Sequence, residues 1–222
     1  QAKGAVWGEL AGMERPLWFD QTAARTRNYT YESPEWFEPV AAECRAAMEE
    51  AVLFDQSSYP IFDISGPDAL AFMQWICANQ IDVAIDQLVY TQWLNDQGGI
   101  EADVTVLRLE RQHFRVTGGC GTWRKDLVWL QSQAKRFDVN VTHRTDLATL
   151  GLMGPKSDAI LHDMLGTTPA QRYYTSSTHR FGDDTLRINR LSYIGEHGYE
   201  LVIQKKTLPA LYDALLASGA DH

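Results

Sequence analysis

The segment "LNDQGGIEADVTVLRL" (residues 94–109) predicts the hairpin on which the interpretation of this chain rests. Asp96-Gln97-Gly98-Gly99 separates two apolar stretches, as is typical of a tight turn between antiparallel strands. Side chains alternate between the two faces of a strand, so the apolar even positions from 100 to 106 share one face. Glu101, Asp103 and Thr105 share the opposite face.

Two interpretations of these carboxylates remain open. In the first, the polar face near the turn is simply solvated. In the second, it borders a cavity, where a carboxylate takes up a proton or stabilises a cation during a reaction.

Composition limits the class of protein. The chain has 222 residues, of which 45% are hydrophobic, and a chain of this size buries enough surface to fold without disulfides or metals. Its formal charge is −9 and no run of Lys or Arg exceeds two residues, so we expect no nucleic-acid partner. No apolar run approaches 18 residues, so we expect no membrane span. We expect a cytoplasmic protein, or a mitochondrial matrix protein in a eukaryote.

Cysteines and histidines indicate no metal site. Cys44, Cys77 and Cys120 are widely spaced and form no CxxC pair, so we interpret them as small buried hydrophobic residues. The histidines show no HxxxH or HExxH spacing.

Residues 1–38 are interpreted as an N-terminal arm or linker of irregular structure, fastened to its neighbour by aromatic side chains: Trp18, Phe19, Trp36 and Phe37. Pro39 suits the first position of a helix. The apolar face expected for that helix consists of Val40, Cys44, Met48 and Val52.

The rest of the chain repeats one order of elements. "YPIFDIS" (59–65) is a predicted strand followed by Gly66-Pro67 and an amphipathic helix, and "LGLMGPKSDAILHDML" (150–165) repeats that pattern around Gly154-Pro155. We predict an α+β fold made of a duplicated β-α-β-β-α unit with antiparallel sheets. The expected halves are residues 39–144 and 145–222, interleaved with each other. No phosphate-binding glycine motif is present.

Two glycine-rich segments are further candidates for a site. "VTGGCGTWRKD" (116–126) joins a strand to a helix for which Thr122 is the expected N-cap, and Gly118 and Gly119 could present free backbone N–H groups to a ligand. Cys120 could act as a nucleophile at this helix start. In "SYIGEHGYE" (192–200), Glu196 lies in a turn between two glycines, which is also the pattern of an ordinary surface turn.

Taken in order, "VYTQWLNDQGGIEADVTVLRL", "FRVTGGCGTWRKDL", "LGLMGPKS" and "RLSYIGEHGYELVI" resemble the folate-binding part of the glycine cleavage T-protein (aminomethyltransferase) family. The likeness is greater to the C-terminal half of sarcosine and dimethylglycine dehydrogenases, in which "GMERPLWF" resembles the entry to the folate region. It extends over nearly all 222 residues. The resemblance implies a duplicated α+β unit with a cavity between its halves.

The resemblance also implies roles for individual residues. Asp103 matches the catalytic aspartate of the family, and Glu196 matches the glutamate that holds the pterin ring. A carboxylate accepts two adjacent pterin N–H groups as a charge-assisted pair. The implied cofactor is tetrahydrofolate, and the residues expected to bind it are Glu196, Tyr90, Tyr193, Gly118 and Gly119.

The implied function is transfer of a one-carbon unit, derived from the iminium of a methylated amine, onto tetrahydrofolate. FAD is expected only in a separate upstream domain or subunit, so amine oxidation is not expected from these residues. The chain has Ala102-Asp103 where T-proteins carry two aspartates, as the dehydrogenases do, and "TGGCG" where T-proteins have a folate-contacting asparagine. From the resemblance we also expect the small β-rich module of the family to be absent from these 222 residues. The alternative is a folate-binding or regulatory module without catalysis.

Overall fold

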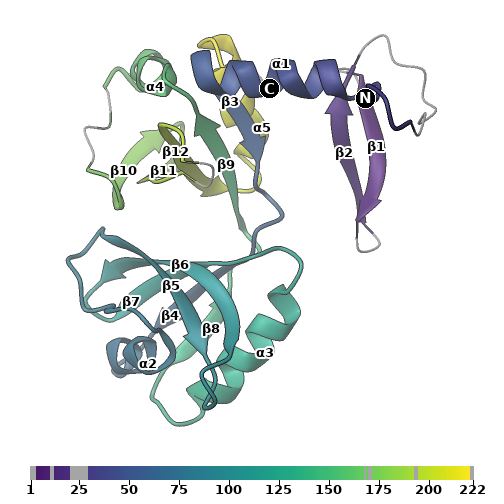
Figure 1. Cartoon of the computed structure of the whole chain (residues 1–222). Coiled ribbons are helices and arrows are strands. Elements are labelled where there is room, and N and C mark those ends of the chain that lie inside the picture. Colours follow the sequence, from purple (N-terminus) through teal and green to yellow (C-terminus); the bar gives the residue numbers. More distant parts are fainter. Residues whose placement is uncertain are drawn as a thin grey trace.

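The computed structural model describes residues 4–10, 13–20, 30–167, 169, 172–192 and 195–220. Two five-stranded sheets form the body of the molecule, and a two-stranded hairpin lies at one side of it (Figure 1). All pairings within these sheets are antiparallel. The predicted α+β class with antiparallel sheets is therefore confirmed.

The first sheet has the strand order β5-β6-β7-β4-β8. Its strands are β4 (Ile61–Ser65), β5 (Leu88–Leu94), β6 (Ile100–Glu110), β7 (His113–Thr117) and β8 (Asn140–His143). Helices α2 (Ala69–Ile76) and α3 (Trp123–Ala134) pack on one face. The predicted alternation of β6 is confirmed, because Val104 and Val106 lie in the core with these helices.

The second sheet has the equivalent order β10-β11-β12-β9-β3. Its strands are β3 (Val52–Asp55), β9 (Leu147–Met153), β10 (Thr175–Phe181), β11 (Asp184–Arg190) and β12 (Gly198–Gln204). Helices α4 (Ser157–Leu165) and α5 (Leu208–Ala217) contribute to the core on one face of this sheet.

The predicted duplication is confirmed, and each unit contains more strands than predicted. The first unit runs β3-β4-α2-β5-β6-β7-α3, and the second runs β8-β9-α4-β10-β11-β12-α5. Each unit places its first strand at the edge of the other unit's sheet, since β3 pairs with β9 and β8 pairs with β4. The halves are therefore interleaved by strand exchange, whereas the boundary between residues 144 and 145 stays a prediction.

The repeated Gly-Pro pairs mark this exchange. Gly66 and Gly154 have φ angles of 137° and 129°. A Cβ atom at Gly66 would lie 2.5 Å from the carbonyl oxygen of Asp138, and one at Gly154 would lie 2.4 Å from that of Glu50. Those carbonyls come just before the exchanged strands β8 and β3, so both glycines allow the other unit's chain to pass close by.

The arm differs from its prediction. Its first part is a hairpin of β1 (Ala5–Leu10) and β2 (Met13–Phe19) instead of an irregular segment. Trp18 is buried as expected, whereas Trp36 and Phe37 are exposed.

The helix after the arm, α1 (Phe37–Glu49), begins two residues before Pro39. Its predicted apolar face was wrong, because Cys44 is exposed, Met48 is 68% exposed and Val52 belongs to β3. The helix instead buries the small side chain of Ala47. It has few neighbours beyond β2 and β3, so little surface is available to cover a longer apolar face.

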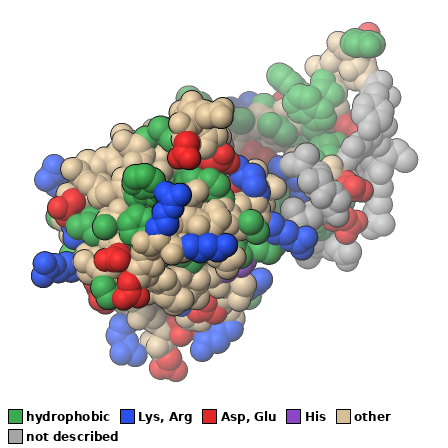
Figure 2. Space-filling model, turned by 90° about the horizontal axis from the view of Figure 1, so that it is seen from below, with side chains coloured by type: hydrophobic (Ala, Val, Ile, Leu, Met, Phe, Trp, Pro, Cys, Tyr) green, Lys and Arg blue, Asp and Glu red, His purple; other side chains and the backbone are tan. Residues whose placement is uncertain are grey.

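One face of the molecule shows no concentration of one charge. In Figure 2, basic, acidic and apolar side chains are interspersed on the face seen from below. No helix in the described part of the chain is long and apolar enough to cross a bilayer. Of the cysteines only Cys77 is buried, which raises its pKa to about 12, so the expectation that all three are buried was wrong.

Candidate functional site

The faces of the two sheets that carry no helices provide the candidate site, and we call them the inner faces. Leu88 and Leu107 from the first inner face pack against Leu191, which follows β11 of the second sheet. The sheets also meet at their edges, where Leu88 N–H donates to the carbonyl of Tyr174 at 2.9 Å and Ser176 N–H donates to that of Asp86 at 2.7 Å. These two bonds belong to an antiparallel bridge between Gln87 and Thr175, which joins the edges of the two sheets.

Asp103 lies on the inner side of β6 and is exposed. The hydroxyl of Tyr90, on the neighbouring strand β5, donates a hydrogen bond to Asp103 Oδ2 at 2.8 Å. That hydrogen bond is the main reason why the pKa of the Tyr90 phenol is raised. Asp103 Oδ1 has no hydrogen-bond partner among the described residues, so one oxygen is oriented by Tyr90 while the other faces outward.

Glu101 lies two residues away on the same strand but is held in a different way. Its Oε1 accepts a hydrogen bond from Asn95 Nδ2 at 3.0 Å, and its Oε2 lies 3.5 Å from Lys125 Nζ. Glu101 therefore fastens the hairpin turn to helix α3. Of Glu101 and Asp103, only Asp103 has an oxygen without a hydrogen-bond or ion-pair partner among the described residues.

The glycine loop lies beside the Asp103 strand. A Cβ atom at Gly118 would lie 3.5 Å from Val104 Cγ1, which places this loop next to the residue that follows Asp103. The N–H of Gly118 donates to the carbonyl of Pro60 at 3.3 Å and is therefore not free for a ligand, contrary to expectation. Gly119 is exposed and Cys120 is partly exposed. Thr122 precedes α3 as predicted, but its hydroxyl donates to Asp126 Oδ2 instead of capping the helix.

The second unit holds the remaining predicted residues. Tyr193 lies outside the described residues. Glu196 is partly exposed in the turn before β12, and its side chain makes no hydrogen bond or ion pair with any described residue. The structure therefore brings together Asp103, Tyr90 and the Gly118 loop, whereas no hydrogen bond or ion pair among the described residues joins Glu196 to them.

Next to Glu196 in the chain, an ion-pair cluster holds the end of this turn. Arg190 Nη1 donates to the carbonyl of Gly198 at 2.7 Å, and Arg190 Nη2 donates to His197 Nδ1 at 2.6 Å. His197 Nε2 then donates to Asp158 Oδ1 at 2.8 Å. Burial opposes ionisation of Asp158, but hydrogen bonds from Tyr199 and His197 lower its pKa overall. These contacts fix the start of β12.

Glu200, in the middle of β12, is a candidate that the sequence interpretation missed. It is only 7% exposed, and its neighbours in the chain, Tyr199 and Leu201, point into the helix-covered core, so Glu200 points to the inner face. No described residue donates a hydrogen bond to its carboxylate, and burial alone raises its pKa to about 7. The alternation in "GYELVIQ" could have indicated this, because Glu200 falls on the opposite face of the strand from Tyr199 and Leu201.

The surroundings of Glu200 are polar and incompletely bonded. Across the sheet its register partners are Asn189 on β11 and Gly151 on β9. Gln56, 6% exposed, and Thr149, 1% exposed, are also buried there, and neither Gln56 Oε1 nor Thr149 Oγ1 has a hydrogen-bond partner. Buried polar atoms without partners are rare in native proteins, so such a group marks a place where a ligand or ordered water binds.

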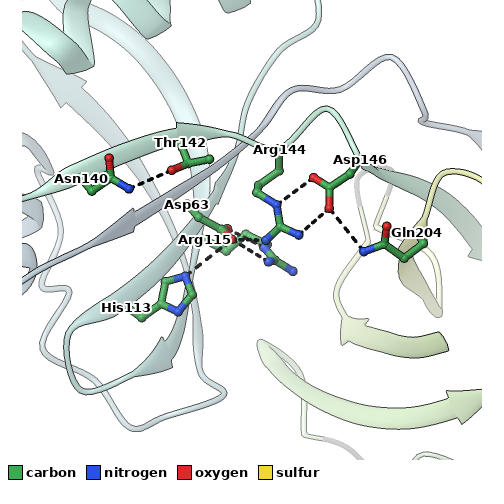
Figure 3. A network of polar contacts seen from close by, with 8 residues as sticks. All are labelled: Asp63, His113, Arg115, Asn140, Thr142, Arg144, Asp146 and Gln204. Atoms are coloured by element: carbon green, nitrogen blue, oxygen red, sulfur yellow. Dashed lines mark hydrogen bonds and ion pairs between the residues drawn. The ribbon is translucent and has the colours of Figure 1, made fainter.

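The equivalent region of the first unit is fully paired (Figure 3). Asp63 on β4 is buried and accepts two hydrogen bonds from Arg115, at 2.8 and 2.9 Å, and one from Arg144 at 2.5 Å. Burial opposes ionisation of Asp63, but the bonds from Arg115, His113 and Arg144 outweigh it and hold its pKa well below the usual range. Arg144 also pairs with Asp146, whose pKa it lowers to about 2, and Asp146 accepts a bond from Gln204 of the second sheet at 3.3 Å. This network joins the two halves.

No group of three or more His, Cys, Asp or Glu side chains within the described ranges has the geometry of a metal site. The polar side chains described on the inner faces include carboxylates, phenols, amides and guanidinium groups. Among them, the carboxylates, phenols and amides bind and orient a ligand that carries N–H donors, and the carboxylates accept protons from it.

Comparison with known proteins defines the class to which this fold and these carboxylates belong. The family model described as the GCVT N-terminal domain matches residues 1–222. The chain is a member of the glycine cleavage T-protein (aminomethyltransferase) family.

Individual relatives belong to two groups. The chain is 38% identical to a 4-methylaminobutanoate oxidase (formaldehyde-forming) from Paenarthrobacter nicotinovorans, over 98% of this chain and 27% of that protein. It is 31% identical to an aminomethyltransferase from Desulfitobacterium hafniense, over 86% of this chain and 53% of that protein. The crystal structure of glycine cleavage system aminomethyltransferase T from Bartonella henselae matches with a TM-score of 0.81 and 25% identity, over 97% of this chain and 54% of that one. The chain thus spans between about a quarter and half of these relatives.

Proposed function

We propose that the chain is a tetrahydrofolate-binding module that transfers a one-carbon unit onto folate. The observation that carries this proposal is the contrast within β6, where Glu101 is paired and Asp103 keeps an accessible oxygen next to Tyr90. Tetrahydrofolate would supply the amine that captures a one-carbon unit at the oxidation level of formaldehyde.

Asp103 is the proposed catalytic residue. An amine that forms a bond to an iminium carbon becomes positively charged and must lose its proton. A carboxylate within hydrogen-bond reach accepts that proton or stabilises the cation. Tyr90 keeps one Asp103 oxygen bonded and so limits the carboxylate to one orientation.

A glutamate is proposed to hold the pterin ring. The resemblance assigns this role to Glu196, and that assignment stays a prediction. The geometry favours Glu200, because a buried carboxylate without a partner is suited to accept two adjacent N–H groups from the ring. Glu196 is partly exposed to solvent, where water competes for the same bonds.

The donor of the one-carbon unit is proposed to be an N-methylated amine that is oxidised by a flavin domain or subunit outside these residues. The relative from Paenarthrobacter nicotinovorans is named as formaldehyde-forming, and another relative, 29% identical over 99% of this chain, is a human mitochondrial sarcosine dehydrogenase. Both names describe oxidation of an N-methylated amine, which supports this class of donor.

Asp103→Asn tests the proposal. Tetrahydrofolate binding is measured by tryptophan fluorescence, and transfer is measured with formaldehyde as the one-carbon source, corrected for the uncatalysed reaction. We expect binding within about twofold of the wild type and a transfer rate lower by roughly 100-fold or more. The matched control is Glu101→Gln on the same face of β6, which should retain transfer.

Two outcomes would count against this assignment. If Asp103→Asn transfers as fast as the wild type, Asp103 is not catalytic. If the wild type binds tetrahydrofolate but never accelerates transfer, the module binds folate without catalysis.

A further inference from the structure

The neighbourhood of Glu200 differs from the equivalent neighbourhood in the first unit at several positions. Asp63 and Gly151 each lie three residues before the equivalent glycines Gly66 and Gly154. In register, Asp63 lies between Arg115 and Thr142, and Gly151 lies between Glu200 and Phe54. Glu200 is therefore equivalent to Arg115 of the first unit. The position equivalent to Asp63 is Gly151, which carries no charged side chain.

Gln56 occupies the position in the second unit that Arg144 occupies in the first unit. Arg144 lies two residues after Thr142, and Gln56 lies two residues after Phe54, so both follow the exchanged edge strand by the same distance. Arg144 reaches back to Asp63. Gln56 likewise reaches over the middle strand, since a Cβ atom at Gly151 would lie 3.3 Å from Gln56 Oε1.

The result is a pair of acceptors on one face. Gly151 and Glu200 are cross-strand neighbours, whose side chains point to the same side of the sheet. Gln56 Oε1 lies over Gly151, so it is about one strand spacing, ~4.8 Å, from the base of Glu200. In the first unit the equivalent positions satisfy each other, whereas Gln56 Oε1 is buried and has no donor. Glycine at position 151 leaves room for this oxygen, because the Cβ atom of any larger residue would press against it.

We propose that Gln56 is a ligand-contacting residue that accepts a further N–H from the pterin edge held by Glu200. This inference rests on the proposed folate function and extends it to a residue outside every motif of the family resemblance. A reduced pterin carries several N–H donors on one side of its ring. Glu200 accepts two of them, and the amide oxygen of Gln56 lies beside it for another.

Gln56→Leu tests the inference because affinity and stability should move in opposite directions. Leucine has a similar volume and removes a buried oxygen that has no partner in the free protein, so the melting temperature should stay the same or rise. The Kd for tetrahydrofolate should rise roughly three- to tenfold, as expected for the loss of one neutral hydrogen bond. Gln97→Leu, the same change at an exposed turn, is the matched control and should alter neither quantity.

The outcomes separate this inference from the proposed function. If the wild type and Gln97→Leu bind tetrahydrofolate, Glu200→Gln loses binding, and Gln56→Leu binds like the wild type, the inference is overturned and the folate function stands. If the wild type does not bind tetrahydrofolate, the proposed function itself fails. A fall in both affinity and melting temperature of Gln56→Leu would assign the amide a structural role and also overturn the inference.

Discussion

The two halves of this molecule share one topology but use the middle of their inner faces differently. In the first half, Asp63 is enclosed by Arg115 and Arg144, and each of these three charges has a partner. In the second half, Glu200 faces Gly151 and has no partner among the described residues. Since a buried unpaired carboxylate destabilises a fold, its presence next to a paired equivalent indicates a role in binding.

The comparison shows how a duplicated fold divides its tasks. The Asp63 network ties the halves together through Arg144, Asp146 and Gln204, so the centre of the first inner face contributes stability. Asp103, the proposed catalytic residue, takes no part in this network. The second inner face leaves the Glu200 carboxylate, Gln56 Oε1 and Thr149 Oγ1 without hydrogen-bond partners among the described residues. Equivalent positions therefore show which groups are structural and which are available to a ligand.

The largest expected effect is on the stability that the paired Asp63 network of the first half provides. Asp63→Asn leaves the partly buried Arg115 without its counter-charge and leaves Arg144 with Asp146 alone, so the free energy of unfolding should fall by about 3–5 kcal/mol. Urea unfolding measures this, with Asp96→Asn in the exposed turn as the control, expected within about 0.5 kcal/mol of the wild type. A small effect at Asp63 would mean that the network does not hold the halves together.

Lowering the pH should reveal the contribution of Asp63 to stability. The pKa of Asp63 is lowered in the folded protein, so its stabilisation is present above the ordinary value of 3.8 and is lost as pH falls below that value. The wild type should therefore lose stability between about pH 4 and 2 more steeply than Asp63→Asn. Parallel curves for the two proteins would contradict this attribution.

In the second half, where Glu200 is unpaired, stability should depend on pH in the opposite direction. Burial raises the pKa of Glu200 from 4.5 to about 7, so ionised Glu200 destabilises the fold. Its contribution to stability is complete below about pH 4.5 and is lost as pH rises to about 7. Glu200→Gln should stabilise the ligand-free protein by up to about 3 kcal/mol at pH 8, and by little at pH 4.5, while abolishing tetrahydrofolate binding. A destabilised Glu200→Gln would show that the carboxylate has a partner.

The two Gly-Pro turns should behave alike. Alanine at Gly66 or at Gly154 places a Cβ atom 2.5 or 2.4 Å from a carbonyl oxygen, with φ angles that alanine rarely adopts. Each change should destabilise by roughly 2 kcal/mol or more, and by similar amounts. Gly98→Ala has an unfavourable φ but meets no atom within 4 Å, so it isolates the backbone contribution. Clearly different effects at the two turns would argue against equivalent strand exchanges.

The smallest effect concerns ligand affinity and pH. Because only ionised Glu200 accepts two N–H groups, the Kd for tetrahydrofolate should fall as pH rises toward about 7 and then level off. Below that range it should change by about tenfold per pH unit. Isothermal titration between pH 5.5 and 8.5 measures this, and an affinity that is independent of pH would exclude Glu200 as the acceptor.

Much of the fold could be predicted from local patterns. Alternation placed Val104 and Val106 in the core and Asp103 on the opposite face, and the repeated Gly-Pro pairs revealed the duplication. The strands β3 and β8 were missed because each is short and gains its place only by pairing with the other unit's sheet. The face of α1 was predicted wrongly because periodicity does not show how little surface lies opposite a helix.

The sequence by itself determined the family, the two related halves and Asp103 on an inner face, because these follow from the order of short motifs and from the period of a strand. Only the tertiary structure decided which carboxylates are neutralised. The basic partners of these acids lie far from them in the chain. Asp63 pairs with Arg115 and Arg144, and Glu101 pairs with Lys125. Strand exchange brings Gln56 next to Gly151 and Glu200, and no local pattern along the chain records that contact.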